Sequence, residues 1–261
     1  MNSTLRDFLI LLMVSGGIFA LIYGWISYKW NSGGEPEGLQ NESMIGEEMK
    51  ERLAVAFEEQ LRFVENDYTR EFEAELDERF SSHPGKGIHI IEGGQVNAFT
   101  TIGDRIYLYR GLVDGLGDPG LVAAVVAHEL GHIHHNHVEV RLKREIGSSL
   151  LASILTGGNQ GMIVELSRTV MGLSFSRQQE LEADDFALEL LEQAGIHPQN
   201  LARAFLRMKT LSETGSGSPP AFLSTHPSIE ERIERILERD IPDDFNEQPF
   251  ELGFNLQQIF E

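Results

Sequence analysis

The residues best suited to metal chemistry lie in the apolar segment from Leu121 to His132. In it, His128, Glu129 and His132 form the pattern H-E-x-x-H. On an α-helix, histidines at positions i and i+4 project from one face, so both imidazoles can reach one zinc ion at roughly 2.0–2.1 Å. The carboxylate of Glu129 lies about 100° round the helix, near a zinc-bound water but not on the ion. The pattern predicts a zinc hydrolase; the alternative is a pair of core histidines that bind no metal.

A catalytic zinc site also needs a third protein ligand and an open coordination position. The chain has no cysteine, so this ligand must be a histidine or a carboxylate. The metzincin class is excluded, because the position of its third histidine is occupied by Val138. Three further histidines follow the motif, and we expect them to have structural or supporting roles: His134, His135 and His137. Although His135 shares the helical face, it lies a further turn along, too far to share an ion with His128.

Two carboxylates further along the chain are better candidates. Glu180 and Asp184 are four positions apart in a second predicted helix, so their side chains face the same way. Glu180 can complete a His-His-Glu zinc site, and Asp184 can accept the second ring N–H of a ligand histidine. The alternative is a solvated acidic face, because Glu182 and Asp185 are interleaved with them.

Together these motifs resemble the HtpX and CAAX prenyl endopeptidase family of gluzincin-type zinc metallopeptidases. The resemblance covers most of residues 88–236 and rests on ordered motifs: H-E-L-G-H, S-R-x-x-E-x-E-A-D from Ser176, S-T-H-P from Ser224, and Arg232. It implies that His128, His132 and Glu180 bind zinc, that Glu129 is the general base and that Asp184 orients a ligand histidine. The chain is most similar to single-anchor or peripheral members that act in envelope or mitochondrial protein quality control.

The resemblance also implies roles for residues outside the two helices. His226 and Arg232 would lie near the scissile carbonyl and donate hydrogen bonds to the developing oxyanion. In some relatives the equivalent of His226 is thought to bind zinc in the fourth position; the alternative is a helix-capping residue. Asn97, Ala98 and Phe99 would form an edge strand that pairs with extended substrate backbone.

The elements that must position these residues are predicted from hydrophobic periodicity. An amphipathic helix is expected over Gly46–Phe80, three short strands over Gly87–Arg110, and the zinc helix after the capping pair Asp118 and Pro119. We therefore predict a mainly helical α+β fold of the zincin type, with a small sheet and a zinc site between two helices.

The segment Phe8–Tyr28 is uncharged and long enough to cross a bilayer, with aromatic residues at its C-terminal end. It predicts an uncleaved single-pass anchor with the catalytic domain on the extracytoplasmic side, periplasmic or equivalent; the alternative is a cleaved signal peptide. The expected organisation is an anchor (1–30), a flexible linker (31–45), a metallopeptidase domain (46–240) and an acidic C-terminal tail (241–261).

Composition narrows the function. The formal net charge of −20 disfavours nucleic acid as a partner. The sequence therefore predicts a membrane-anchored zinc endopeptidase that acts on polypeptides in protein quality control. One alternative is a tethered chaperone or scaffold with a structural metal. The other is a zinc aminopeptidase, which the lack of a Met-Glu-Asn sequence disfavours.

Overall fold

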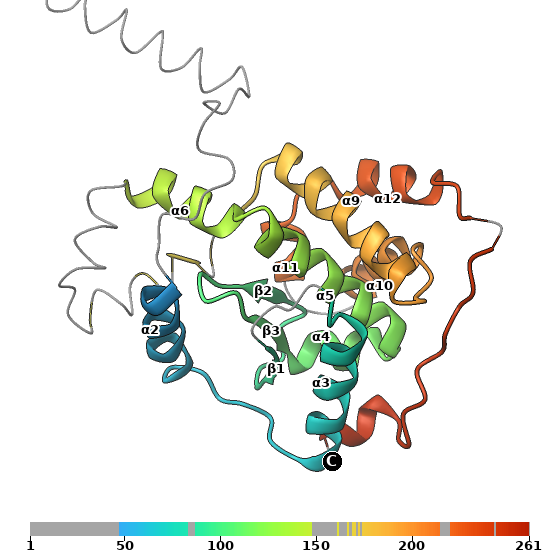
Figure 1. The fold of residues 1–261 in the computed structure, drawn as a ribbon, viewed down its shortest axis with the longest axis horizontal. Coiled ribbons are helices and arrows are strands. Elements are labelled where there is room, and N and C mark those ends of the chain that lie inside the picture. Colours follow the sequence, from blue (N-terminus) through green and yellow to red (C-terminus); the bar gives the residue numbers. More distant parts are fainter. Residues whose placement is uncertain are drawn as a thin grey trace, which may run out of the picture. The chain divides into compact units, whose positions relative to one another are not determined.

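The chain divides into two units, Met1–Gln40 and Asn41–Glu261, and every described residue belongs to the second. The computed structural model describes residues 47–82, 87–147, 174–214, 220–242 and 244–260, together with 161, 166, 169, 170 and 172 (Figure 1). The predicted anchor (1–30) and linker (31–45) lie outside these residues. Within the described part, none of the helices combines the length and the apolar character that crossing a membrane requires.

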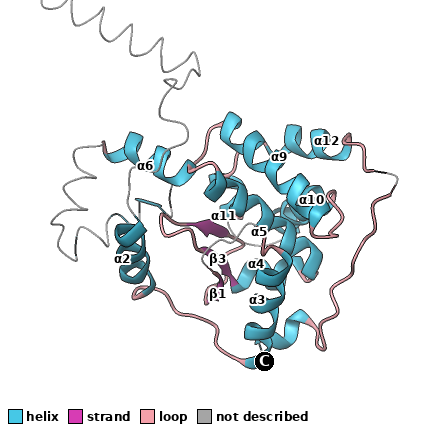
Figure 2. Ribbon diagram, viewed as in Figure 1, coloured by secondary structure: helices cyan, strands magenta, loops and turns pink. Residues whose placement is uncertain are grey.

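The described part is mainly helical with one small sheet, which confirms the predicted α+β class (Figure 2). The sheet consists of β1 (Ile88–Ile91), β2 (Ala98–Thr100) and β3 (Ile106–Tyr109). The helices are α2 (Glu47–Glu58), α3 (Asp67–Arg79), α4 (Arg110–Leu116), α5 (Pro119–His134), α6 (His137–Ile146), α9 (Arg177–Gln193), α10 (Asn200–Thr214), α11 (Ala221–Thr225), α12 (Ile229–Leu237) and the 3-10 helix η1 (Leu256–Phe260).

The sheet has the strand order β1-β3-β2, with β1 parallel and β2 antiparallel to β3. Among the described strands, β2 therefore has a partner on one side only. The Asn97 carbonyl accepts a hydrogen bond from the Tyr109 N–H at 3.1 Å, so Asn97 and, by alternation, Phe99 present their backbone groups to β3. It follows that the N–H and C=O groups of Ala98 and Thr100 point toward the outer edge.

The helix predicted to bind zinc, α5, begins where the sequence predicts. Asp118 is its N-cap and accepts a hydrogen bond from the Leu121 N–H at 3.0 Å, while Pro119 occupies the first turn. Most of α5 is apolar and fully buried, so the helix lies in the centre of the fold and packs against α9, α10 and β2 (Figure 1). A helix that is apolar on all sides needs such a position.

Helices α5 and α9 approach each other closely at Gly131. A Cβ atom at this position would lie 2.7 Å from the carbonyl oxygen of Ala183 and 2.8 Å from its Cα. Such contacts with backbone atoms cannot be relieved by moving a side chain, so the glycine is required for this helix spacing. The spacing in turn brings the carboxylates of α9 to the histidines of α5.

The prediction of a single helix over Gly46–Phe80 is wrong, because the chain leaves α2 after Glu58 and starts α3 at Asp67. The segment between them runs beside β1, where the Val64 N–H donates to the Ile90 carbonyl at 2.9 Å. Asn66 then caps α3. The apolar spacing continues through the break because this extended segment also buries apolar side chains, so periodicity alone did not reveal the break.

The segment 241–261, which we predicted to be an acidic C-terminal tail, has described residues that pack against the domain. Leu256 and Ile259 belong to the main hydrophobic core. Arg79 donates to the carbonyls of Gln248 and Pro249 at 2.7 Å each, and this anchors the segment to α3. The described part of this segment is therefore packed onto the domain, because its apolar residues alternate with the acidic ones.

Candidate metal centre

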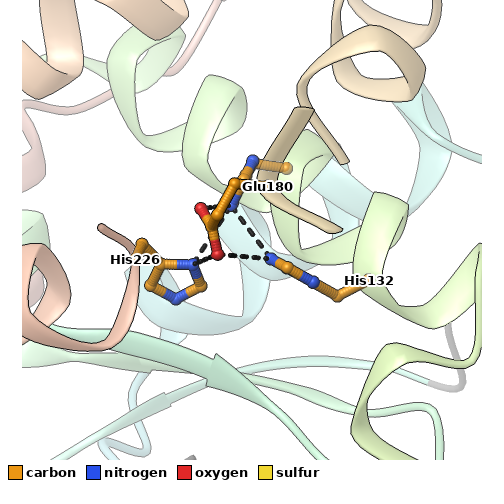
Figure 3. Close-up of side chains that lie close together, drawn as sticks. His132, Glu180 and His226 are labelled. Atoms are coloured by element: carbon orange, nitrogen blue, oxygen red, sulfur yellow. Dashed lines mark hydrogen bonds and ion pairs between the residues drawn. The ribbon is translucent and has the colours of Figure 1, made fainter. Parts of the chain in front are cut away.

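Four side chains converge between α5, α9 and the residue that follows α11. His128, His132, Glu180 and His226 each offer one ligand atom, and these atoms all lie within 4.8 Å of one another. All four residues are buried. Figure 3 shows His132, Glu180 and His226 pointing toward one another from separate elements. The structure thus brings together the three predicted ligands and one residue predicted for catalysis.

The geometry of the cluster suits a zinc ion. The Nε2 atoms of His128 and His132 are 3.1 Å apart, and they lie 3.6 and 3.7 Å from the Glu180 carboxylate. Burial lowers the pKa of His128 and places the pKa of His132 well below its usual value, so both imidazoles are neutral at pH 7. Two neutral imidazoles and a carboxylate are a donor set that zinc prefers, so these residues fit the metal.

His226 lies within this cluster and beside Glu129. Its Nδ1 atom is 3.1 Å from Glu180 Oε1 and 3.2 Å from His128 Nε2, and its Nε2 atom is 3.5 Å from Glu129 Oε1. The ring stacks on Phe222 with centroids 4.1 Å apart. This position is compatible both with a fourth metal ligand and with a donor to a substrate oxygen, so both roles remain predictions.

Glu129 is buried, and neither of its carboxylate oxygens has a hydrogen-bond partner among the described residues. Burial raises its pKa to about 7, against the lowering effects of His226 and of the Thr100 backbone N–H. A buried carboxylate that accepts no hydrogen bond costs free energy, and such groups occur where a reaction needs them. The Thr100 N–H also indicates that the outer edge of β2 faces this side of the site.

A buried carboxylate orients His128. The Nδ1 atom of His128 lies 3.0 Å from Asp184 Oδ1, on the side of the ring opposite the ligand cluster. Arg232 donates two hydrogen bonds to Asp184, from Nε and Nη2, at 2.7 Å each. Burial opposes ionisation of Asp184, but Arg232 and His128 outweigh it and hold the Asp184 pKa at about 2. We call His128, Asp184 and Arg232 the inner arm of the site.

Arg232 is fully buried, and each nitrogen of its guanidinium has a carboxylate partner. Nε and Nη2 bind Asp184, while Nη1 binds Glu180. Burial raises the Glu180 pKa, but His226 and Arg232 outweigh it, so the net pKa lies below its usual value. The predicted role of Arg232 as a donor near the scissile carbonyl stays a prediction; in the structure its guanidinium binds the side chains of Asp184 and Glu180.

His132 is oriented by a different set of residues. Its Nδ1 atom lies 2.9 Å from Nδ1 of His137, and Nε2 of His137 lies 3.1 Å from Glu182 Oε2. Burial lowers the His137 pKa to about 4, despite the opposing effect of Glu182. We call His132, His137 and Glu182 the outer arm, because the Glu182 side chain is 38% exposed.

Sequence reasoning gave His137 only an unspecified supporting role and left Glu182 on a solvated face. The sequence held one signal for this contact: His137 follows His132 by five residues, just beyond the end of the helix. The other two histidines of that run lie differently. His134 is exposed and stacks on Phe186, and His135 packs against the His137 ring.

The predicted substrate strand lies next to the zinc helix. Ala98 and Phe99 belong to β2, which packs against α5, and Asn97 immediately precedes the strand. The Asn97 side chain is buried, and its Oδ1 atom has no hydrogen-bond partner among the described residues. The strand, its outer edge and Glu129 therefore lie together.

Comparison with known proteins identifies the family. The model of peptidase family M48 matches residues 65–240. The chain belongs to this family. LoiP, a metalloprotease of Escherichia coli, is 34% identical over 151 residues, which cover 55% of this chain and 58% of LoiP. The E. coli metalloprotease YcaL is 30% identical over 152 residues, with the same coverage. The mitochondrial metalloendopeptidase OMA1 of Schizosaccharomyces pombe is 32% identical over 158 residues, covering 58% of this chain and 45% of OMA1.

The M48 match includes every residue of the site, from Asn97 just before β2 to Arg232 on α12, and confirms the family resemblance predicted from the motifs. Helix α2 and the C-terminal segment lie outside the M48 match. The aligned region spans little more than half of LoiP and YcaL and less than half of OMA1.

Proposed function

We propose that this chain is a zinc-dependent endopeptidase that hydrolyses peptide bonds within polypeptides. The observation that carries the proposal is the buried convergence of His128, His132 and Glu180. Beside them lies the carboxylate of Glu129, which accepts no hydrogen bond from the described residues. Membership of a peptidase family and the similarity to proteins named metalloproteases support it.

The residues divide the chemistry between them. His128, His132 and Glu180 would hold the ion, which when bound polarises the peptide carbonyl and the attacking water. Glu129 removes a proton from that water and delivers it to the leaving amine. Its pKa of about 7 suits a group that must both accept and release a proton near neutral pH.

We assign Arg232 to positioning, because its guanidinium is bound to Asp184 and Glu180. For His226 two roles stay open. As a donor its Nε2 would serve a substrate oxygen next to Glu129, and as a fourth ligand its Nδ1 would close the site. Zinc affinity separates them, since loss of a ligand weakens metal binding and loss of a substrate donor does not.

The substrate class follows from β2. We propose that an extended peptide pairs with the outward N–H and C=O groups of Ala98 and Thr100, and so adds a strand to the sheet. Main-chain pairing of this kind recognises extended backbone, which favours unfolded or flexible segments as substrates. The closeness of the Thr100 N–H to Glu129 supports this arrangement.

The decisive experiment is the variant Glu129→Gln in the full chain. We expect cleavage of an unfolded protein to fall by about 10²–10⁴-fold, because the general base is lost, while zinc content stays unchanged. A chelator should abolish cleavage by the unaltered chain. Glu189→Gln, at an exposed position of α9, serves as the control and should cleave normally. Normal cleavage by Glu129→Gln would refute the assignment.

We also propose that Phe8–Tyr28 anchors the protein in a membrane, with the domain outside the cytoplasm, in a protein quality-control role. The uncharged sequence of this segment supports the anchor. One similar protein is named a beta-barrel assembly-enhancing protease, which is compatible with work in an envelope. Extraction of membranes at alkaline pH tests the anchor: the full chain should stay in the pellet, and a chain starting at Asn31 should not.

The position of His226 favours one competing function, a scaffold with a closed structural zinc site. Structural sites have four protein ligands, and His226 lies within the ligand cluster. The two functions differ in cells that depend on the protein. Rescue by Glu129→Gln would favour the scaffold, whereas failure of a stably folded Glu129→Gln would favour the peptidase.

A further inference from the structure

The outer arm contains two residues that the proposed mechanism does not use, His137 and Glu182. We propose that they form a relay that fixes His132 in the tautomer needed for metal binding, which makes both of them positioning residues. The inference rests on the proposed function only in taking the cluster of His128, His132 and Glu180 as a zinc site.

The contacts determine where the protons lie. The Nε2 atom of His132 faces the ligand cluster and must present a lone pair, so the neutral ring carries its proton on Nδ1. That proton is donated to Nδ1 of His137, 2.9 Å away. His137 must then carry its own proton on Nε2, which donates to Glu182 at 3.1 Å. Each of these two hydrogen bonds is compatible with only one position of the proton. The final acceptor is the carboxylate of Glu182.

The turn after α5 makes this relay possible. Asn136 adopts a left-handed conformation, with φ 54° and ψ 29°, which asparagine tolerates better than most residues. The helix is interrupted there, and α6 starts with the His137 ring beside that of His132. Glu182 comes from the facing helix α9 and also accepts a hydrogen bond from Gln178 at 2.9 Å. Three elements thus converge on one ring.

A purely space-filling role for His137 makes different predictions. The residue is only 3% exposed, and its ring lies near Phe175 as well as His132. If packing were its whole role, an apolar side chain would replace it at least as well as a polar one. If it accepts the His132 proton, only a side chain with an acceptor near the same point can replace it.

The test measures the zinc affinity of the full chain by competition with a zinc-binding dye. We expect His137→Leu to bind zinc 10–100-fold more weakly, as is common when the partner of a ligand histidine is lost. His137→Gln offers an acceptor oxygen and should stay within about tenfold of the unaltered chain. Glu182→Gln keeps an acceptor but loses the charge, so its affinity should fall by less than that of His137→Leu. The control is His134→Gln, on the exposed side of the same helix end.

Several outcomes would overturn the relay. These are equal losses in His137→Leu and His137→Gln, an unchanged affinity in Glu182→Gln, or a loss in His134→Gln as large as that in His137→Leu. Should His137→Leu fail to fold, Glu182→Gln decides alone, because this partly exposed side chain can be changed without emptying the core. Failure of the unaltered chain to bind zinc would overturn the proposed function as well, so the two failures are distinguishable.

Discussion

The inner and outer arms perform one task in two physical settings. In the proposed site, each accepts the outer ring N–H of a histidine that we predict to bind the metal. The inner arm does so with a fully buried carboxylate held by Arg232, whereas the outer arm uses a second imidazole and the partly exposed Glu182. A buried ion pair is costly to break, whereas a partly exposed pair contributes little to stability. We therefore expect damage to the inner arm to unfold the domain and damage to the outer arm to weaken metal binding.

The largest expected effect comes from Arg232→Met. The variant leaves Asp184 and Glu180 buried without their cation, so the free energy of unfolding of the metal-free chain should fall by about 3–5 kcal/mol. The matched control is Arg235→Met on the same helix, whose pair with Asp185 is exposed and should contribute less than about 1 kcal/mol. Denaturant unfolding measures both. Equal effects of the two variants would show that the buried ion pairs of the inner arm contribute no more to stability than an exposed pair.

A substitution at Gly131, where α5 and α9 are in contact, should affect both arms. In Gly131→Ala the new Cβ would meet the backbone of Ala183 at under 3 Å, so α9 must move away from α5. We expect a loss of about 1–3 kcal/mol in unfolding free energy, together with weaker zinc binding. Gly94→Ala is the control for adding a methyl group, since a Cβ there meets no heavy atom within 4 Å of those described and the backbone does not adopt a positive φ. Unchanged zinc affinity in Gly131→Ala would show that the ligands do not depend on this spacing.

Acid should act on the two arms in different pH ranges. The unfolded chain protonates His137 near pH 6.5 and the folded chain near pH 4, so the unfolded state binds more protons in between. The stabilisation from this group is therefore complete above pH 6.5. As the pH drops below that value, the free energy of unfolding decreases by up to about 1.4 kcal/mol per pH unit for this group. Asp184, with a pKa of about 2, loses its contribution only below about pH 3.8.

Urea unfolding of the metal-free chain between pH 7 and pH 4.5 tests this difference. His128 and His132 add to the slope, because burial lowers their pKa values as well. The informative quantity is thus the difference between the unaltered chain and His137→Gln, whose curve should be shallower. Parallel curves would contradict the assignment. Zinc content should fall over the same range, because both ligand histidines must lose their protons to bind.

The smallest expected effect is that of Glu182→Gln on stability. Since the Glu182 side chain is partly exposed, we expect the unfolding free energy to change by less than about 1 kcal/mol, even where zinc binding weakens. Denaturant unfolding and dye competition on one preparation give both quantities. A loss of several kcal/mol would mean that the outer arm supports the fold in the same way as the inner arm.

Local patterns in the sequence predicted much of the site. The motif, its capping pair and the four-residue spacing of Glu180 and Asp184 are local features, and local geometry determines which face each side chain occupies. The three short strands were predicted on the same basis. The convergence of His128, His132 and Glu180 could be inferred because each motif has a narrow set of chemical uses.

The parts that the sequence did not predict depend on contacts between distant segments. The break between α2 and α3 arises from pairing with β1, which leaves no trace in the helical spacing. Arg232 binds Asp184 across 48 positions of sequence, so its burial against the ligands could not be derived locally. The role of Glu182 depends on the helix break at Asn136, which places the ring of His137 beside that of His132.

The packed C-terminal segment makes the stability of the domain depend on residues far from the metal cluster. A cut between Gln248 and Asn255 would detach Leu256 and Ile259 from the interior while every metal-binding side chain stayed in place. The apolar surfaces of α3 and of the released piece would then be open to water and to other proteases. We expect trimming at this end to destabilise the protein without any chemical change at its metal cluster.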